Sequence, residues 1–279
     1  MRDGCLASEG GAEGGKKLLR NARTRGIRGV ILMAALAFHL VLWARPTPVE
    51  KIPQIPAGTV IPIKLDGTFD VTLAHVQQKI EARVTQEVPL PGKEKVSLRA
   101  RVFGTVVAVK KDGDSTVSVS VKFDQLEEKD QTSPITTSVR AIASYQSVRN
   151  AQLPLTGADA GTPAGWGTTV QIGGDIRFGD GGKVRNRAKQ TVGKGVIGGV
   201  LVHLAANQAG GCDGSAAGER PQATFVFSAD ACGVYDLKNL KITHNGRSDP
   251  IGVITLEFAK NDMKLESGTA FLLRTVKEH

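Results

Sequence analysis

Two stretches of alternating apolar and polar residues constrain the fold of this 279-residue chain more than any other feature. Residues 96–109 read VSLRARVFGTVVAV and residues 117–123 read VSVSVKF, so apolar side chains recur at every second position. A period of two is typical of β-strands with one buried face. Asp112 and Gly113 lie between the stretches, and Asp-Gly favours a tight hairpin turn because it tolerates positive φ angles. The sequence therefore predicts a β-hairpin over residues 96–123.

The same pattern predicts a register for this hairpin. A two-residue turn at the Asp-Gly pair would place residues opposite each other when their numbers add up to 225, because 112 + 113 = 225. Val106 would then lie opposite Val119, and Val102 would lie opposite Phe123. The apolar residues of both strands would share one face, whereas a slip by one residue would expose them all.

A second pattern opens and closes the predicted strand region. Residues 55–65 read IPAGTVIPIKL and residues 265–275 read LESGTAFLLRT, and each places Gly-Thr before a short apolar run broken by one basic residue. We interpret Gly58 and Gly268 as turn residues, since glycine adopts positive φ angles without steric cost. Either the two strands lie side by side and join the ends of the folded region, or two ordinary turn–strand units resemble each other by coincidence. Pro62 lacks a backbone donor, so the first strand is expected at a sheet edge or a bulge.

Further stretches with strand character follow along the chain, and few residues before position 185 have a helical period. The candidate strands are 59–65, 79–87, 134–145, 222–228, 251–258 and 269–276, with one short helical turn within 71–79. We therefore expect a mainly β fold with a barrel or sandwich core, an N-terminal transmembrane or signal helix, and one Gly-rich helical or irregular excursion.

Composition divides the chain into seven segments. They are a basic cytoplasmic N-terminus (1–28), a signal peptide or transmembrane anchor (29–44), a Pro-bearing connector (45–57), a β domain (58–150), a flexible Gly-rich linker (151–185), a Gly-rich apolar segment (186–218) and C-terminal strands that complete the β domain (219–279). The linker is predicted because residues 154–183 are rich in Gly, Thr, Ala and Asp without a helical period.

The N-terminal apolar run predicts a cell-envelope address. Residues 29–44 read GVILMAALAFHLVLWA without a charge, and residues 1–28 carry seven basic and three acidic side chains. A basic flank before an apolar run keeps the flank in the cytoplasm, so the rest of the chain crosses the membrane. As a helix the run spans about 24 Å, shorter than the ~30 Å hydrocarbon core, which is typical of a signal peptide. Leu42, however, occupies a cleavage-site position that favours a small residue, so a cleaved signal and a retained anchor both stay open, with a buried soluble helix as a third reading.

We expect the protein to be anchored in the inner membrane or secreted to the periplasm, with the lipid bilayer as a partner through residues 29–44. His39 lies inside this run, where a neutral imidazole in an apolar stretch is the preferred reading over a functional group.

The cysteines agree with an exported body. Cys5 precedes the apolar run, and only Cys212 and Cys232 follow it. Two cysteines in an exported segment most simply form one disulfide, here closing a loop of 20 residues. Two free or metal-binding thiols are the alternative, although no C-x-x-C spacing or zinc-like histidine pattern accompanies them.

Residues 184–208 combine a basic start with a small-residue apolar segment that contains Gly193, Gly195, Gly198 and Gly199. Three readings compete. A G-x-G-x-x-G pattern occurs at 193–198, but no strand pattern precedes it, so a dinucleotide site is disfavoured. The glycines could instead permit close packing in an interaction segment, as in glycine zippers. The simplest reading is a helix or loop packed on the sheet.

No sequence motif predicts an enzyme. The G-x-S-x-G, H-E-x-x-H and Walker patterns are missing, so we expect no catalytic residues, no metal and no cofactor. Aromatic residues make up 5% of the chain, and beyond residue 28 the charge is only +5, from 29 basic and 24 acidic side chains. Single-stranded nucleic acids are usually bound by clustered basic residues with aromatic stacking, so no nucleic-acid partner is expected.

The anchor, the proline-bearing connector, IPAGTVIPIKL and RVFGTVVAV together resemble TrbI-like proteins of type IV secretion channels over residues 55–124. This resemblance implies a β-barrel on the far side of the inner membrane. The order of a strand-rich AGT segment, a glycine-zipper-like segment and a final Gly-Thr strand also resembles bacterial envelope proteins of unassigned role. The expected function is a non-enzymatic structural or binding role in the periplasm, within a secretion or envelope assembly, with envelope partners or self-association. A periplasmic enzyme or small-ligand-binding protein is the alternative.

Overall fold

The computed structural model describes residues 55–113, 116–129, 131–152, 169–178, 182–196, 199–201, 212, 222–259 and 264–277. The predicted anchor at 29–44, with His39, and Cys5 lie outside these residues. Within the described ranges, no helix is long and apolar enough to cross a membrane.

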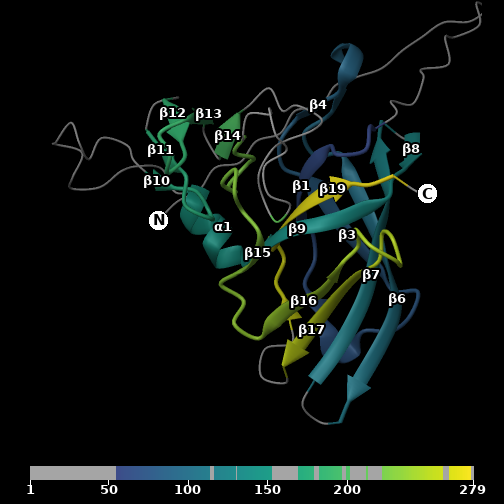
Figure 1. The fold of residues 1–279 in the computed structure, drawn as a ribbon. Coiled ribbons are helices and arrows are strands. Elements are labelled where there is room, and N and C mark those ends of the chain that lie inside the picture. The colour runs from purple at the N-terminus through teal and green to yellow at the C-terminus, as the bar shows by residue number, and fades with distance from the viewer. Residues whose placement is uncertain are drawn as a thin grey trace, which may run out of the picture. The chain divides into compact units, whose positions relative to one another are not determined.

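Ten strands form one sheet that curls into a nearly closed barrel (Figure 1). Their order is β15-β9-β19-β1-β3-β6-β7-β17-β16, and β8 pairs with β7. The bounds are β1 (Val60–Leu65), β3 (Lys79–Val84), β6 (Arg101–Asp112), β7 (Thr116–Glu128), β8 (Gln131–Pro134), β9 (Thr137–Ala143), β15 (Gly233–Tyr235), β16 (Leu240–Asn245), β17 (Ile254–Ala259) and β19 (Ala270–Thr275). Every neighbouring pair is antiparallel except β15 and β9.

The sheet nearly closes because its two edge strands are consecutive in the chain. Only residues 236–239 separate β15 from β16. Across the gap, the Thr137 hydroxyl of β9 donates to the Phe123 carbonyl of β7 over 2.8 Å. The predicted mainly β class is therefore confirmed, and of the two predicted cores, barrel or sandwich, the structure has a nearly closed barrel-like sheet.

Alternate positions of the strands fill the barrel interior. In β7 the buried residues follow a period of two from Val117 to Phe123, as the sequence pattern predicted. The rings of Phe123 and Phe271 contact each other at 5.6 Å between centroids. Because few aromatic residues are available, valine, isoleucine and leucine form most of this core.

Smaller elements complete the described chain. Two short pairs are β2 (Phe69–Asp70) with β18 (Lys264–Leu265) and β4 (Val88–Pro89) with β5 (Lys95–Val96). The helical elements are η1 (Val71–Leu73), η2 (Pro91–Lys93) and α1 (Tyr145–Gln152). A separate five-stranded sheet contains β10 (Thr169–Val170), β11 (Ile176–Arg177), β12 (Lys183–Arg185), β13 (Thr191–Val196) and β14 (Gly199–Leu201), in that order.

The β6–β7 hairpin forms, but its predicted register is wrong. Asp112 pairs with Thr116, so Asp112 ends a strand and the loop has three residues instead of two. Phe123 lies opposite Gly104 and not opposite Val102, after one register shift between Ala108 and Val106; a second shift follows between Gly104 and Phe103. A side chain at position 104 would place its Cβ only 2.8 Å from the Phe123 ring. The ring therefore needs a glycine opposite it, and bulges keep the apolar faces together.

The two Gly-Thr strands lie side by side, so pairing, not coincidence, explains their similarity. β1 and β19 are antiparallel neighbours. The Gly58 N–H donates to the Thr275 carbonyl, and the Gly268 N–H donates to the Leu65 carbonyl, each over 2.8 Å. Gly58 and Gly268 have φ angles of 91° and 88°, which glycine adopts readily. Each Gly-Thr turn is thus hydrogen-bonded to the last residue of the other strand.

Pro62 does not mark an edge strand, contrary to expectation. β1 pairs with β19 on one side and with β3 on the other. Pairing with β3 begins at Ile63, and the Pro62 carbonyl accepts a hydrogen bond from the Thr85 N–H just beyond β3. The missing donor is accommodated where the β1–β3 ladder ends, so the proline lies in an interior strand.

The Gly-rich excursion is neither helical nor irregular over its described part. Residues predicted as linker form β10, β11 and β12, and the Gly-rich apolar segment contributes β13 and β14. The predicted strand 222–228 is instead a turn-rich segment with isolated bridges at Thr224 and Phe227. A short helix, α1, was not expected.

Candidate functional site

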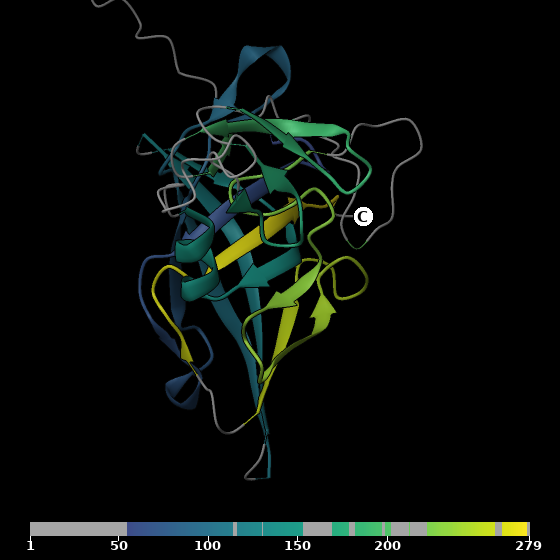
Figure 2. The ribbon, with the colours of Figure 1, turned by 90° about the vertical axis from the view of Figure 1, so that its left-hand side faces the viewer.

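The five-stranded sheet has one face directed to solvent, and this face is the candidate site. On the left of Figure 1 and facing the viewer in Figure 2, the sheet lies beside α1. Residues directly opposite each other in an antiparallel ladder share a face. Val170 pairs with Ile176, which pairs with Arg185 on the next strand. Lys183 pairs with Lys194 further along. We call this side, with Phe178, the outer face.

Three apolar side chains lie exposed on the outer face. Val170 is 59% exposed, Ile176 44% and Phe178 41%. Phe178 follows Ile176 by two positions, and its N–H donates to the Lys183 carbonyl, which continues the ladder beyond β11. Single exposed apolar residues are common on proteins, but a group on one hairpin marks a contact surface.

The same sheet carries most of the net charge of the body. Residues 169–196 contain six basic and two acidic side chains, or +4. The rest of the chain after residue 28 contains 23 basic and 22 acidic side chains, or +1. Lys183, Arg185 and Lys194 are exposed on the outer face. The outer face therefore combines apolar and basic groups.

The opposite, inner face packs on the segment that precedes β15. Val184 and Val192 form a small buried cluster with Ala223 and Ala229. Arg177 also lies buried on this side, and burial lowers the pKa of its guanidinium. The sheet thus has an inner face that holds it in place, and no buried apolar cluster of the described residues includes Val170, Ile176 or Phe178.

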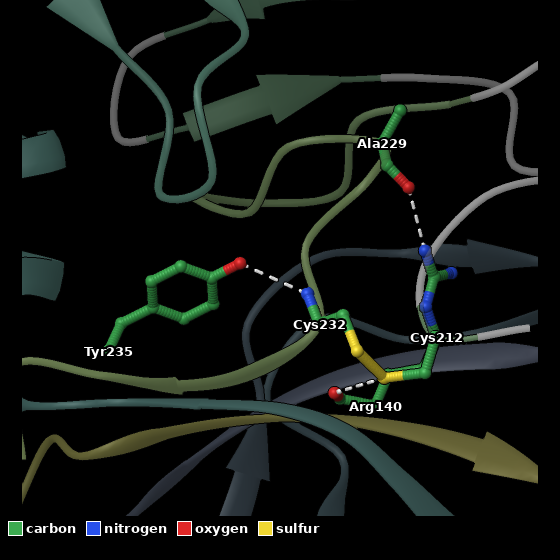
Figure 3. Close-up of a disulfide and its surroundings, with 5 residues drawn as sticks. All are labelled: Arg140, Cys212, Ala229, Cys232 and Tyr235. Carbon is green, nitrogen blue, oxygen red and sulfur yellow. Dashed lines mark hydrogen bonds between the residues drawn. A yellow bond between two sulfur atoms is a disulfide. The ribbon is translucent and has the colours of Figure 1, made fainter. Parts of the chain in front are cut away.

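A buried carboxylate fixes the β10–β11 loop to this segment. Asp175 Oδ2 accepts a hydrogen bond from the Ala229 N–H at 2.7 Å. The Ala229 carbonyl in turn accepts from Arg140 Nη2 of β9, also at 2.7 Å (Figure 3). Burial raises the pKa of Asp175 to about 6, and the charge of Asp230 adds to this, against the lowering effect of the Ala229 N–H. One residue, Ala229, therefore joins the sheet to the barrel through its N–H and its carbonyl.

Two buried glutamines hold the same segment. Gln86, just after β3, accepts a hydrogen bond from the Phe225 N–H at 2.6 Å. The Gln171 amide nitrogen, in the orientation that satisfies its partners, donates to the Phe225 and Val226 carbonyls at 3.0 and 3.1 Å. The segment is thus bonded to the barrel on one side and to the sheet on the other.

The predicted disulfide pair closes this region. Cys212 and Cys232 have their sulfurs at bonding distance and their Cα atoms 5.1 Å apart (Figure 3). The Cys232 N–H donates to the Tyr235 hydroxyl at 3.0 Å. Cys212 Sγ lies 3.3 Å from the Arg140 carbonyl, a contact without a hydrogen bond because a disulfide sulfur carries no hydrogen. The pair therefore links residue 212 to the residue just before β15, and Cys212 contacts β9 at Arg140.

The glycines predicted as an interaction segment belong to the candidate site. Gly193 and Gly195 lie in β13 and Gly199 in β14, whereas Gly198 is outside the described residues. β13 and β14 form an antiparallel pair. A dinucleotide site needs a helix N-terminus after the glycines, so this reading is excluded. Of the predicted turn residues, Gly113 has a positive φ of 56° in the β6–β7 loop.

Sequence reasoning missed the apolar residues of the outer face. The stretch TVQIGGDIRF, residues 169–178, was assigned to a flexible linker because of its glycines. Its Gly173-Gly174 pair between two short apolar stretches is a hairpin signal of the kind used for Asp112-Gly113. Both glycines have positive φ angles, 102° and 112°.

A second feature is a cavity of about 550 Å³ at one end of the barrel. It is lined by residues 122–125 of β7, residues 134–137 and the turn at Ile251-Gly252. Asp124 Oδ1 is buried there without a hydrogen-bond partner. Among the described residues, no group of three or more His, Cys, Asp or Glu side chains is placed to hold a metal ion.

No protein-family model matches the chain, and no curated protein matches it in sequence.

Proposed function

We propose that this chain is a non-enzymatic cell-envelope protein whose barrel presents the five-stranded sheet as a binding surface. The observation that carries the proposal is the outer face, where Val170, Ile176 and Phe178 are exposed beside Lys183, Arg185 and Lys194. A sheet that is held by one face and leaves apolar and basic groups on the other is suited to contact a larger partner.

The proposed location in the cell envelope rests on two features of different kinds. The apolar run at 29–44 with its basic flank is typical of export or anchoring. Disulfides persist in oxidising compartments such as the periplasm, and Cys212 and Cys232 are at disulfide distance. Together they support a body on the far side of the inner membrane.

The resemblance to TrbI-like proteins suggests a place in a secretion or envelope assembly. The barrel opened by a Gly-Thr strand, β1, agrees with what that resemblance implies. The binding surface is the testable part of this assembly role.

The experiment is fractionation of cells that express the tagged full-length chain, followed by crosslinking. A photo-reactive residue at Ile176 should crosslink within the envelope fraction. The same residue at Leu98, which is 51% exposed on the β5–β6 connection, should crosslink far less. Recovery of the chain from the cytosol, or equal crosslinking from both positions, would overturn the proposed function.

The barrel-end cavity favours a second candidate function, small-ligand binding. Asp124 Oδ1 lacks a partner there, so a ligand with a hydrogen-bond donor would satisfy it. Small amines such as ethanolamine should raise the midpoint of thermal unfolding of the wild-type protein and not of Asp124→Ala. An equal shift in both proteins would contradict ligand binding at Asp124.

A further inference from the structure

We infer that the outer face of the five-stranded sheet binds the surface of a bilayer that contains anionic lipids. This inference rests on the proposed envelope function and names the partner of that binding surface. It adds a contact beyond the N-terminal run, made by Val170, Ile176 and Phe178 together with Lys183, Arg185 and Lys194.

The geometry places apolar and basic groups on one side of one sheet. The register aligns Val170, Ile176 and Arg185 across three adjacent strands. Lys183 and Lys194 lie opposite each other on β12 and β13. Interfacial elements bury an apolar stripe at the boundary of headgroups and acyl chains and keep Lys and Arg among the headgroups. The outer face has both components within one small area.

The charge distribution selects an anionic partner. The sheet region carries +4 of the +5 found after residue 28. Its described carboxylate, Asp175, is 3% exposed on the inner side and does not offset the basic face. Arg187 and Lys189, in the β12–β13 connection, are exposed as well. Anionic headgroups attract such clusters over about a Debye length, ~8 Å at physiological salt.

A bilayer fits this face better than a nucleic acid or an acidic protein. Phe178 is the single aromatic side chain identified on the outer face, so a platform for stacked bases is missing. The predicted anchor ends at residue 44, and the described chain begins at Ile55. Eleven residues reach at most about 40 Å when fully extended, so a retained anchor would hold Ile55 within that distance of the bilayer.

The test uses hydrogen–deuterium exchange on the full-length chain reconstituted into phosphatidylcholine bilayers with and without phosphatidylglycerol. The N-terminal run inserts into both bilayers, so only a local readout reports the sheet. Peptides that cover residues 169–178 and 182–196 should exchange at least about threefold more slowly in the anionic bilayers, and high salt should remove this protection. Equal exchange in both bilayers would overturn the inference.

Two sets of variants separate the charge and apolar contributions. Lys183→Glu/Arg185→Glu/Lys194→Glu should abolish the lipid-dependent protection, whereas Lys110→Glu/Lys111→Glu, in exposed positions of β6, should retain it. Val170→Ser/Ile176→Ser/Phe178→Ser should reduce it, with Leu73→Ser, at a side chain 73% exposed elsewhere, as the matched control. Unfolding midpoints check that each variant is folded.

The outcomes also distinguish this inference from the proposed function. If Ile176 crosslinks to a protein in the envelope and exchange is independent of phosphatidylglycerol, the lipid contact is wrong and the envelope function holds. If the chain is recovered from the cytosol, the envelope function itself is wrong. Protection of the sheet by added nucleic acid in place of lipid would overturn the choice of partner.

Discussion

Asp175 is the buried carboxylate through which the β10–β11 loop is fixed to the segment before β15. Its oxygen accepts the Ala229 N–H, and Ala229 accepts from Arg140 on the barrel. Gln86 serves the same segment by accepting the Phe225 N–H. At the residue scale, polar side chains fasten the sheet to the barrel because the intervening chain, with its isolated bridges, has few ladder bonds of its own.

Asp175→Asn should change the pH dependence of stability. The pKa of Asp175 is about 6 in the folded protein against 3.8 ordinarily, so between these values the folded state binds more protons than the unfolded state. The free energy of unfolding should therefore fall as pH rises from about 4 to 6, by up to about 3 kcal/mol from this group. Asparagine keeps an acceptor for Ala229 but carries no charge. Urea unfolding across this range should show the extra pH dependence in the wild type only; parallel profiles would contradict it.

Gln86→Ala should destabilise the protein by about 1–3 kcal/mol, because the buried Phe225 N–H would lose its acceptor. Gln125→Ala, at an exposed glutamine of β7, is the control and should change stability by less than about 0.5 kcal/mol. Urea unfolding of both variants measures the difference. A similar small effect of the two substitutions would show that the Gln86 bond is not needed.

At the element scale, β1 and β19 form a locally two-fold unit. The Gly58 N–H donates to Thr275 and the Gly268 N–H donates to Leu65. The two bonds are equivalent, because each acceptor lies seven positions after the glycine of its own strand. Thr59 and Thr269, the residues after the glycines, are both buried. Each turn therefore begins one strand while its glycine N–H bonds to the last residue of the other.

The two glycines should differ in their tolerance of alanine. Gly58→Ala should cost about 1–2 kcal/mol because φ is 91°, a region that L-residues avoid. Gly268→Ala should cost more, since its Cβ would also lie 2.6 Å from Cδ2 of Tyr145. Gly67→Ala has open space around the added Cβ and should change stability by less than about 0.5 kcal/mol. Unfolding midpoints rank the three; equal costs at 67 and 268 would refute the turn argument.

At the scale of the whole molecule, the body combines a nearly closed barrel with a smaller sheet. The barrel is completed by strands from both ends of the described chain, β1 and β19. The small sheet is inserted between β9 and β15, two strands that pair with each other in parallel. The Cys212–Cys232 pair lies where the chain returns from this insertion to the barrel.

Removing the disulfide should destabilise the protein. Cys212→Ser/Cys232→Ser should lower the free energy of unfolding by about 3 kcal/mol, because the 20-residue loop would no longer be closed in the unfolded state. Wild-type protein in reducing agent should match the double variant, and Cys5→Ser should match untreated wild type. Urea unfolding with and without reductant is the measurement. An unchanged wild-type midpoint under reduction would contradict a stabilising disulfide.

Local patterns in the sequence were sufficient for several features. Alternation in residues 117–123 identified β7, the Gly-Thr strings identified β1 and β19, and the compartment argument paired Cys212 with Cys232. The strand signals lie within a few residues of the strands they predict. For the cysteines, only Cys212 and Cys232 follow the apolar run, so only one pairing was available. The mainly β class followed from the same alternation.

Tertiary structure alone decided the rest, because the deciding contacts join residues far apart in the chain. The β6–β7 register follows from the Phe123 ring, which packs against Gly104 and Phe271 inside the barrel. Pro62 lies in an interior strand because β3 stops pairing just where the missing N–H would be needed. Residues 169–178 became strands, not linker, because their inner side is buried on a segment some fifty positions later. Burial against distant partners is not written in a local pattern, and it is this burial that left the outer face exposed.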